Sequence, residues 1–315
     1  MMQLRNLFAT YALGFLLLGL YSCNSNTSEA TQDNPTRGTI ALSVDEAYKP
    51  VMDALTQAYR YKFPEAHFEI RYLPEQKAIL ELLQDSVRMA FVTRELTADE
   101  HKMLEQQKSV AKTHKVAIDG VALVVPINSS DTLIRLNELE SVLKGNISTW
   151  NQLANAKKSS NIDIVVDDAN SANLQYFKNR FSIDDFTKAR IIVAGSNEKV
   201  VETVRVNPNA IGIIGVNWIS DKKEASSVAL SEGIKTMSVA YSDTSAYLKP
   251  FQGDLYEGYP LARQLYAISR EAHAGLGGGL LTYIARDAGG LIIMKMGLVP
   301  NIPYVRNVEL EASPK

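Results

Sequence analysis

The sequence predicts an α/β fold with two lobes and mostly parallel sheets. Short apolar segments rich in β-branched residues alternate with segments of helical periodicity along most of the chain, which is the pattern of parallel strands covered by helices. The alternation falls into two blocks that join near Asp119 and again near Val239. The 315 residues also exceed the length of one typical domain, which favours two lobes.

The first block alternates between strand and helix from Gly38 onward. Its longest helix is amphipathic and ends at Pro64, and a later helix begins at a capping box formed by Thr97 and Glu100. The expected strands are Thr39–Ser43, Phe68–Tyr72 and Met89–Val92, and the expected helices are Ala47–Lys62, a segment through Ile79, Leu82 and Leu83, and one from Thr97 through Glu105.

A long apolar segment, Val116–Val125, separates the blocks. It is long for one strand, and Asp119-Gly120 interrupts it. We therefore expect a strand that crosses between the lobes and bends at Asp119 and Gly120, which would act as a hinge.

The second block continues the same alternation. Asn137 is expected to cap one helix and Ser171 another. The remaining expected elements are the strands Ile162–Val166, Ile191–Val193, Ile211–Val216 and Gln264–Ser269, and the helices Asn197–Val206, Leu280–Asp287 and Leu291–Met296.

The N-terminus has the pattern of an export signal. Arg5 precedes an apolar run from Leu7 to Leu20, which is shorter than the about 20 residues that a membrane-spanning helix needs. The run ends in Leu20-Tyr21-Ser22-Cys23, which looks like a bacterial lipobox. We predict a signal peptide at residues 1–22, lipidation of Cys23 and a flexible polar tether at residues 23–37; an ordinary free thiol is the alternative for Cys23.

Composition and spacing exclude several classes of function. A net charge of −2 offers no basic excess for nucleic acid, and a single cysteine allows no internal disulfide. None of the four histidines has the spacing of a metal motif, and the chain has no G-x-S-x-G. We therefore expect no metal, no cofactor and no enzymatic activity, and a monomer whose only membrane attachment is the lipid.

Five segments in order resemble those of one family. Val116–Val125 resembles a crossover strand, Gly145–Trp150 a turn after a helix, and Asn207–Gly215 an Asn-Pro-Gly-Ala-Ile-Gly-Tyr segment. Tyr259–Arg263 is similar to Tyr-Pro-Leu-Ser-Arg and Gly297–Pro300 to Gly-Phe-Val-Pro. The family is that of the PstS-type phosphate-binding proteins of ABC importers, and the likeness covers roughly residues 38–300.

The resemblance implies a periplasmic-binding-protein type II fold with discontinuous lobes and two hinge strands. We expect one lobe at residues 38–118 and 240–315 and the other at residues 119–239. Function then follows as an expectation: a lipid-anchored protein on the periplasmic or extracellular side of the cell envelope that captures phosphate or a similar small anion and hands it to an ABC permease.

The ligand contacts are expected in three loops. A buried oxyanion needs backbone N–H groups at helix starts, hydroxyls and cations. In the third loop the resemblance aligns Asp168 and Ser171 with an Asp and a Ser of the family's Arg-Asp-Ser-Gly-Ser-Gly-Thr-Arg motif. The expected contacts are Ser43 and Val44, then Thr93 and Arg94, then Asp168, Asn170, Ser171, Ala172 and Asn173.

The third loop also departs from the family pattern. Asp167 stands in place of the motif's first Arg, Asn173 in place of its Thr, and Leu174 in place of its last Arg. An unpaired carboxylate facing a buried dianion is costly. Three explanations are open. The carboxylates turn away from the ligand, or they accept a proton from a protonated ligand oxygen, or the ligand is not phosphate. A sensing or interaction module of the envelope without transport, and less favourably a lipid-anchored hydrolase, are the alternative functions.

Overall fold

The computed structural model describes residues 33–302, apart from the side chain of Asp287. The predicted signal peptide and the lipidation site Cys23 lie outside the described residues. The residues from Asn34 onward belong to one compact unit. Asn34 and Arg37 pair with each other, and the Tyr59 hydroxyl donates to the Pro35 carbonyl. The described chain therefore joins the folded unit at Asn34, three residues before the predicted end of the tether.

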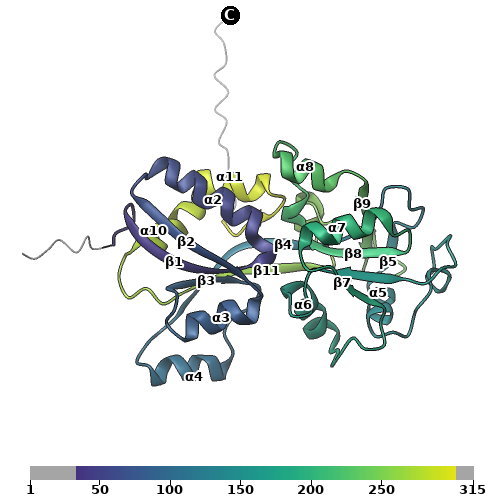
Figure 1. Cartoon of the computed structure of the whole chain (residues 1–315), viewed down its shortest axis with the longest axis horizontal. Coiled ribbons are helices and arrows are strands. Elements are labelled where there is room, and N and C mark those ends of the chain that lie inside the picture. Colours follow the sequence, from purple (N-terminus) through teal and green to yellow (C-terminus); the bar gives the residue numbers. More distant parts are fainter. Residues whose placement is uncertain (1–32, 303–315) are drawn as a thin grey trace, which may run out of the picture. The chain divides into compact units, whose positions relative to one another are not determined.

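The first lobe has a central sheet with helices on both faces (Figure 1). Strand β1 (Gly38–Asp45) pairs in parallel with β2 (Ala66–Leu73) and β3 (Met89–Val92). Apolar side chains of β1 alternate with polar ones, and the helices cover both faces. One face carries α2 (Lys49–Lys62), α10 (Leu276–Ile284) and α11 (Asp287–Lys295); the other carries α3 (Glu75–Leu83) and α4 (Ala98–Gln106).

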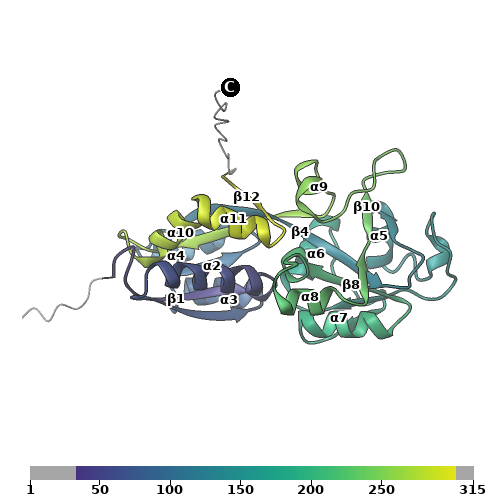
Figure 2. The same ribbon diagram turned by 90° about the horizontal axis from the view of Figure 1, so that it is seen from above.

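The second lobe repeats this arrangement. Strand β6 (Asp163–Val166) pairs in parallel with β7 (Ile191–Val193) and β8 (Ala210–Gly215). Helices α6 (Ala172–Phe181) and α7 (Asn197–Val206) both pack on β8, and Figure 2 shows α7 and α8 on the same side of the sheet. The other elements are β5 (Leu133–Arg135), α5 (Leu136–Leu143), α8 (Ala225–Ser231), β9 (Ile234–Thr236), β10 (Ser238–Ala240) and α9 (Gln252–Tyr256).

Two antiparallel strands join the lobes. Strand β4 (Lys112–Pro126) pairs with β11 (Ala262–Ser269) through its first half and with β8 through its second half. The two strands place the described sheet in the order β2-β1-β3-β11-β4-β8-β6-β7, and β12 (Val299–Pro300) pairs with β4 as well. The predicted crossing strand is thus present, and its partner is β11.

The second crossing is made by the strand β11. Val239 is fully buried in the apolar core of the second lobe, and Leu255, Tyr259 and Leu261 belong to the same core. The chain leaves that core where β11 begins, at Ala262.

Local sequence accounts for several element boundaries. Thr97 and Glu100 form the predicted capping box of α4, and the Ser171 hydroxyl caps α6 by accepting from the Leu174 amide. Asn137 is not the cap of α5, because that helix begins one residue earlier and its cap position is Arg135. No helix among the described residues is both long enough and apolar enough to cross a bilayer.

Candidate functional site

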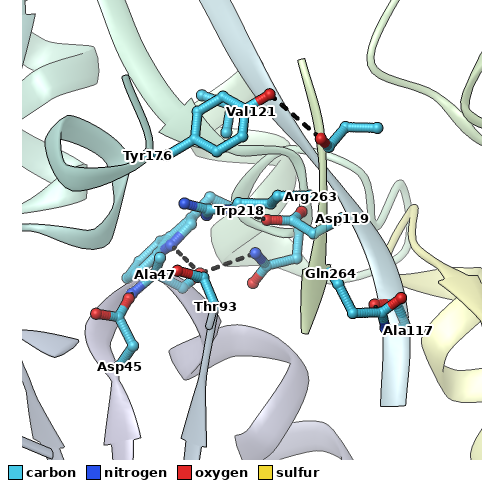
Figure 3. Close-up of polar contacts among 12 residues, drawn as sticks. Asp45, Ala47, Thr93, Ala117, Asp119, Val121, Tyr176, Trp218, Arg263 and Gln264 are labelled. Carbon is cyan, nitrogen blue, oxygen red and sulfur yellow. Dashed lines mark hydrogen bonds and ion pairs between the residues drawn. The ribbon is translucent and has the colours of Figure 1, made fainter. Parts of the chain in front are cut away.

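A buried arginine lies where the lobes join. Arg263 is the second residue of β11 and is only 6% exposed. Its Nε donates to Asp119 Oδ2 over 2.9 Å, and its guanidinium carbon lies 5.3 Å from the centre of the Tyr48 ring. Its Nη1 and Nη2 have no hydrogen-bond partner among the residues that the structure describes. Figure 3 shows Arg263 and Asp119 between Thr93 and Asp45 on one side and Tyr176 on the other.

Two carboxyl groups of the first lobe are buried in the same region, and one of them, Asp45, interacts with this arginine. Asp45 ends β1, and Glu75 begins α3; each is 2% exposed. Burial raises the pKa of Asp45 to about 8, the nearby Glu75 adds to the rise, and Arg263 opposes it. Asp45 accepts from the Ala47 amide over 2.9 Å, and Glu75 accepts from the Thr93 amide over 2.6 Å and from its hydroxyl.

The second lobe contributes a carboxyl group and amides. Asp167 follows β6, and burial raises its pKa. Its Oδ2 accepts from Asn197 Nδ2 over 3.3 Å, whereas its Oδ1 has no partner. Asn173 of α6 is fully buried and neither of its side-chain polar atoms is hydrogen-bonded. Asp167 also contributes to the raised pKa of Asp45, so the two lobes share one electrostatic environment.

A pair of hydrogen bonds closes the two lobes beside this cluster. The Ala47 carbonyl, in the short 3-10 turn η2 (Glu46–Tyr48), accepts from Asn217 Nδ2 over 2.8 Å and from Trp218 Nε1 over 3.0 Å. Both donors come from the second lobe, in the turn η4 (Val216–Trp218). A Cβ on Gly215 would lie 2.9 Å from Asn217 Nδ2 and 3.7 Å from Arg263 Nη2. We name Arg263, Asp119, Asp45, Glu75 and Asp167 the interlobe polar cluster.

The predicted residues of the first two loops lie close to this cluster, but most of their polar groups already form hydrogen bonds within the protein. The Ser43 hydroxyl donates to Glu81, and Val44 is buried in the core of the first lobe. The backbone amide and the hydroxyl of Thr93 both donate to Glu75. Arg94 makes two hydrogen bonds of 2.8 Å to Glu100, and its Nε is 4.0 Å from Glu75.

The predicted residues of the third loop divide into two groups. Asp168 accepts from the Asn170 amide over 2.7 Å, and Asn170 is exposed. Ser171, Ala172 and Asn173 are buried at the start of α6. Ligand contact by the residues of all three loops stays a prediction.

The predicted hinge residues lie in the middle of β4. Asp119 is fully buried and pairs with Arg263. A Cβ on Gly120 would lie 3.1 Å from side-chain atoms of Leu255 and Pro250, so only glycine fits without displacing them. Hinge motion at these residues stays a prediction.

The sequence reasoning missed Arg263, Asp45 and Glu75 as members of the site. Arg263 lies in the segment Tyr259–Arg263 that carried the resemblance, and it is the one cation within that segment. Its burial beside Asp119 depends on strand pairing over 144 residues, which no local pattern reveals. Among the described residues, no group of three His, Cys, Asp or Glu side chains is arranged to hold a metal ion.

A separate groove of about 1070 Å³ lies between α2 and α11 on one side and the η4–α8 segment on the other. Trp218 lines it, together with Pro50, Ala54, Ile292 and Met296. The members of the interlobe polar cluster do not line it.

Comparison with known proteins identifies the family. A family model described as a PBP superfamily domain matches residues 29–288. This chain belongs to the PBP superfamily. Its relatives in that superfamily include the phosphate-binding protein PstS of Bacillus subtilis, which is 22% identical over 282 residues, covering 89% of this chain and 86% of that protein.

Solved structures of similar proteins share the two-lobed fold. A Clostridium perfringens protein described as a phosphate ABC transporter substrate-binding protein, with bound phosphate, has a TM-score of 0.68 at 18% identity and covers 84% of this chain and 99% of its own. An ABC-type phosphate transport receptor from Vibrio cholerae has a TM-score of 0.63 at 18% identity. The match covers 84% of this chain and 100% of that protein's chain. The predicted fold class is confirmed.

Proposed function

We propose that this chain is a solute-binding lipoprotein of the cell envelope that captures phosphate or a related oxyanion between its lobes and delivers it to an ABC permease. The relatives named as phosphate-binding proteins support this class of ligand. Attachment through Cys23, a position outside the cytoplasm and a monomeric state belong to the same proposal.

The observation that carries the proposal is the guanidinium of Arg263. A buried arginine whose Nη1 and Nη2 are both without partners offers two parallel donors, the geometry that suits a carboxylate or phosphoryl group. Its position on a strand that joins the lobes supports a binding site between them. Arg263 corresponds to the Arg of the Tyr-Pro-Leu-Ser-Arg segment and is kept, whereas Asp167 and Leu174 stand in place of two arginines of the family's anion loop.

The mechanism follows from the two crossing strands. Both lobes are joined by β4 and β11, so bending of these strands near Asp119 and Gly120 would open and close the space around Arg263. Closure would bring the Ala47 carbonyl to Asn217 and Trp218 and remove the anion from water. The start of α6, with Ser171, would then supply backbone N–H groups from the second lobe.

Isothermal titration of the purified chain with phosphate, sulfate and phosphate monoesters tests the proposal. We expect at least one of these anions to bind, and Arg263→Met to weaken its affinity at least tenfold, because a charge-assisted hydrogen bond contributes about 1.5–3 kcal/mol. Arg60→Met, which changes an exposed arginine on α2, is the matched control. Equal affinities for the Arg263 variant and the wild type would refute the assignment of Arg263.

Anchoring needs its own experiment. We expect metabolic labelling with a radioactive fatty acid to mark the wild-type chain and not Cys23→Ala. Label retained on the Cys23 variant would contradict lipidation at this residue.

A second candidate function is favoured by the carboxyl groups. Asp167 and Asn173 replace an arginine and a threonine of the family's anion loop, which suits a sensing or interaction module that keeps the fold without transport. Absence of heat with every solute tested would favour this candidate over import.

A further inference from the structure

The interlobe polar cluster contains more acid than base. Asp45, Glu75, Asp119 and Asp167 are all buried; Asp45 interacts electrostatically with Glu75 and Asp167, and Tyr48 with Asp45, Glu75 and Asp119. Arg263 is the cation among them, and Asp119 already pairs with it over 2.9 Å. Arg94 is held by Glu100, with Glu75 at 4.0 Å. Asp45 and Asp167 are therefore left without a cationic partner of their own in the described structure.

The unpartnered atoms around the cluster include both donors and acceptors. The donors are the two Nη atoms of Arg263 and Asn173 Nδ2, and the Tyr48 hydroxyl can donate or accept. The buried oxygens without a hydrogen-bond donor outnumber them. They are Asp119 Oδ1, Asp167 Oδ1, Asn173 Oδ1, Asn197 Oδ1 and Asn217 Oδ1.

A simple dianion satisfies only half of this set. It would accept from Arg263, but its remaining oxygens would face amide oxygens and ionised carboxylates, which have no hydrogen to offer; only a carboxyl group that is protonated, such as Asp45, has one. Buried polar atoms left without partners cost free energy, as do like charges at short range. A ligand that also carries an ammonium group brings three donors and a positive charge to the acidic side of the cluster.

We propose that the solute is a small zwitterion, whose phosphoryl or phosphonyl group binds Arg263 and whose ammonium group lies among Asp45, Asp167 and the neighbouring amide oxygens. The inference rests on the proposed function, because it assigns the ligand of the same site. It goes beyond that function by making the carboxyl groups ligand contacts.

Proton release provides a signature of this binding mode. The Asp45 carboxyl group interacts electrostatically with Glu75 on α3, Asp167 after β6 and Arg263 on β11, and Tyr48 on η2 interacts with both Asp45 and Asp119 on β4. Burial keeps its carboxyl group protonated at neutral pH, since its pKa is raised to about 8. An arriving ammonium group favours the ionised form, so the zwitterion should release a proton on binding, whereas a further anion should not.

The experiment is isothermal titration of the whole chain at pH 7 with four compounds. They are 2-aminoethylphosphonate, ethylphosphonate, which lacks the ammonium group, ethanolamine, which lacks the anion, and inorganic phosphate. We expect 2-aminoethylphosphonate to bind at least tenfold more tightly than ethylphosphonate and phosphate. Repeating the titration in two buffers of different ionisation enthalpy should show net release of protons.

Variants separate the two ends of the ligand. Asp45→Asn keeps the cap on the Ala47 amide and should reduce the preference for the ammonium compound at least fivefold, whereas the exposed Asp99→Asn should not. Ethylphosphonate or phosphate binding as tightly as 2-aminoethylphosphonate would overturn the zwitterion while leaving the proposed function intact. No binding of any anionic compound would overturn both.

Discussion

Arg263 and Asp119 face each other in register across the two strands that join the lobes. Their side chains meet over 2.9 Å and are 2% and 0% exposed, so the ion pair is removed from water. The pair fixes the guanidinium at the crossing while leaving Nη1 and Nη2 free. The same side chain therefore serves the joint between the lobes and the proposed anion site.

Breaking this pair should destabilise the fold strongly. We expect Arg263→Met to lower the free energy of unfolding by about 3–5 kcal/mol, because Asp119 would keep a buried charge without compensation. The double variant Arg263→Met with Asp119→Leu should recover most of this loss. Urea unfolding of the two single variants and the double variant measures the coupling. Additive losses would show that the pair is not coupled.

Arg94 provides the contrasting case. The sequence favours Arg94 as an anion contact, but in the structure Glu100 holds it through two hydrogen bonds of 2.8 Å. We therefore expect Arg94→Ala to leave anion affinity within about twofold of wild type and to cost at most about 1 kcal/mol of stability. Titration calorimetry measures the anion affinity. A tenfold loss in Arg94→Ala would show that Arg94 does contact the anion.

The fold was accessible from the sequence because its signals are local. The apolar β-branched segment Val116–Val125 lies within β4, and Thr97 and Ser171 cap helices as their spacing predicts. The elements that were missed, such as β5, β10 and α9, are short. Three to five residues are too few to establish a helical or strand period.

Only part of the site could be predicted from the sequence, because many of the side chains that pair there are distant in the chain. Ser43 is a predicted ligand contact, but in the structure its hydroxyl donates a hydrogen bond to Glu81 on α3. Arg94 follows β3, yet its guanidinium is hydrogen-bonded to Glu100, six residues later in the chain. Arg263 joins Asp119 through strand pairing alone. Sequence position indicates which loops lie at the sheet edge, but not which side chains are already paired.

The acidity of the cluster predicts how stability changes with pH. Burial, with Glu75 nearby, raises the pKa of Asp45 from 3.8 to about 8. Between these values the folded chain holds a proton that the unfolded chain has released. The free energy of unfolding should therefore fall as the pH rises from about 4 to about 8, by up to about 1.4 kcal/mol per pH unit for this group.

Asp45→Asn isolates this contribution, since the amide does not titrate. Urea unfolding at several pH values should give a flatter dependence for this variant than for the wild type or for Asp99→Asn. A wild-type slope retained in Asp45→Asn would show that other groups control it.

The cap of α6 can be tested against the cap of α7. Ser171 and Ser196 each accept from the amide three residues later, so Ser171→Ala and Ser196→Ala should each cost about 1 kcal/mol of stability. If Ser171 also contacts the solute, only its variant should lose affinity, by about tenfold. Equal affinities for the two variants would limit Ser171 to capping.

The bonds from Asn217 and Trp218 to the Ala47 carbonyl should favour the closed form. Trp218→Phe removes the Nε1 donor that spans the lobes, whereas Trp150→Phe removes a similar donor to Asn209 within the second lobe. A hydrogen bond contributes about 0.5–1.5 kcal/mol, so Trp218→Phe should weaken solute affinity by up to about tenfold, and Trp150→Phe should lower stability without changing affinity. Calorimetry and urea unfolding of both variants measure the two effects. Affinity that falls equally in both variants would mean that the loss follows general destabilisation, and that the contact with Ala47 does not control closure.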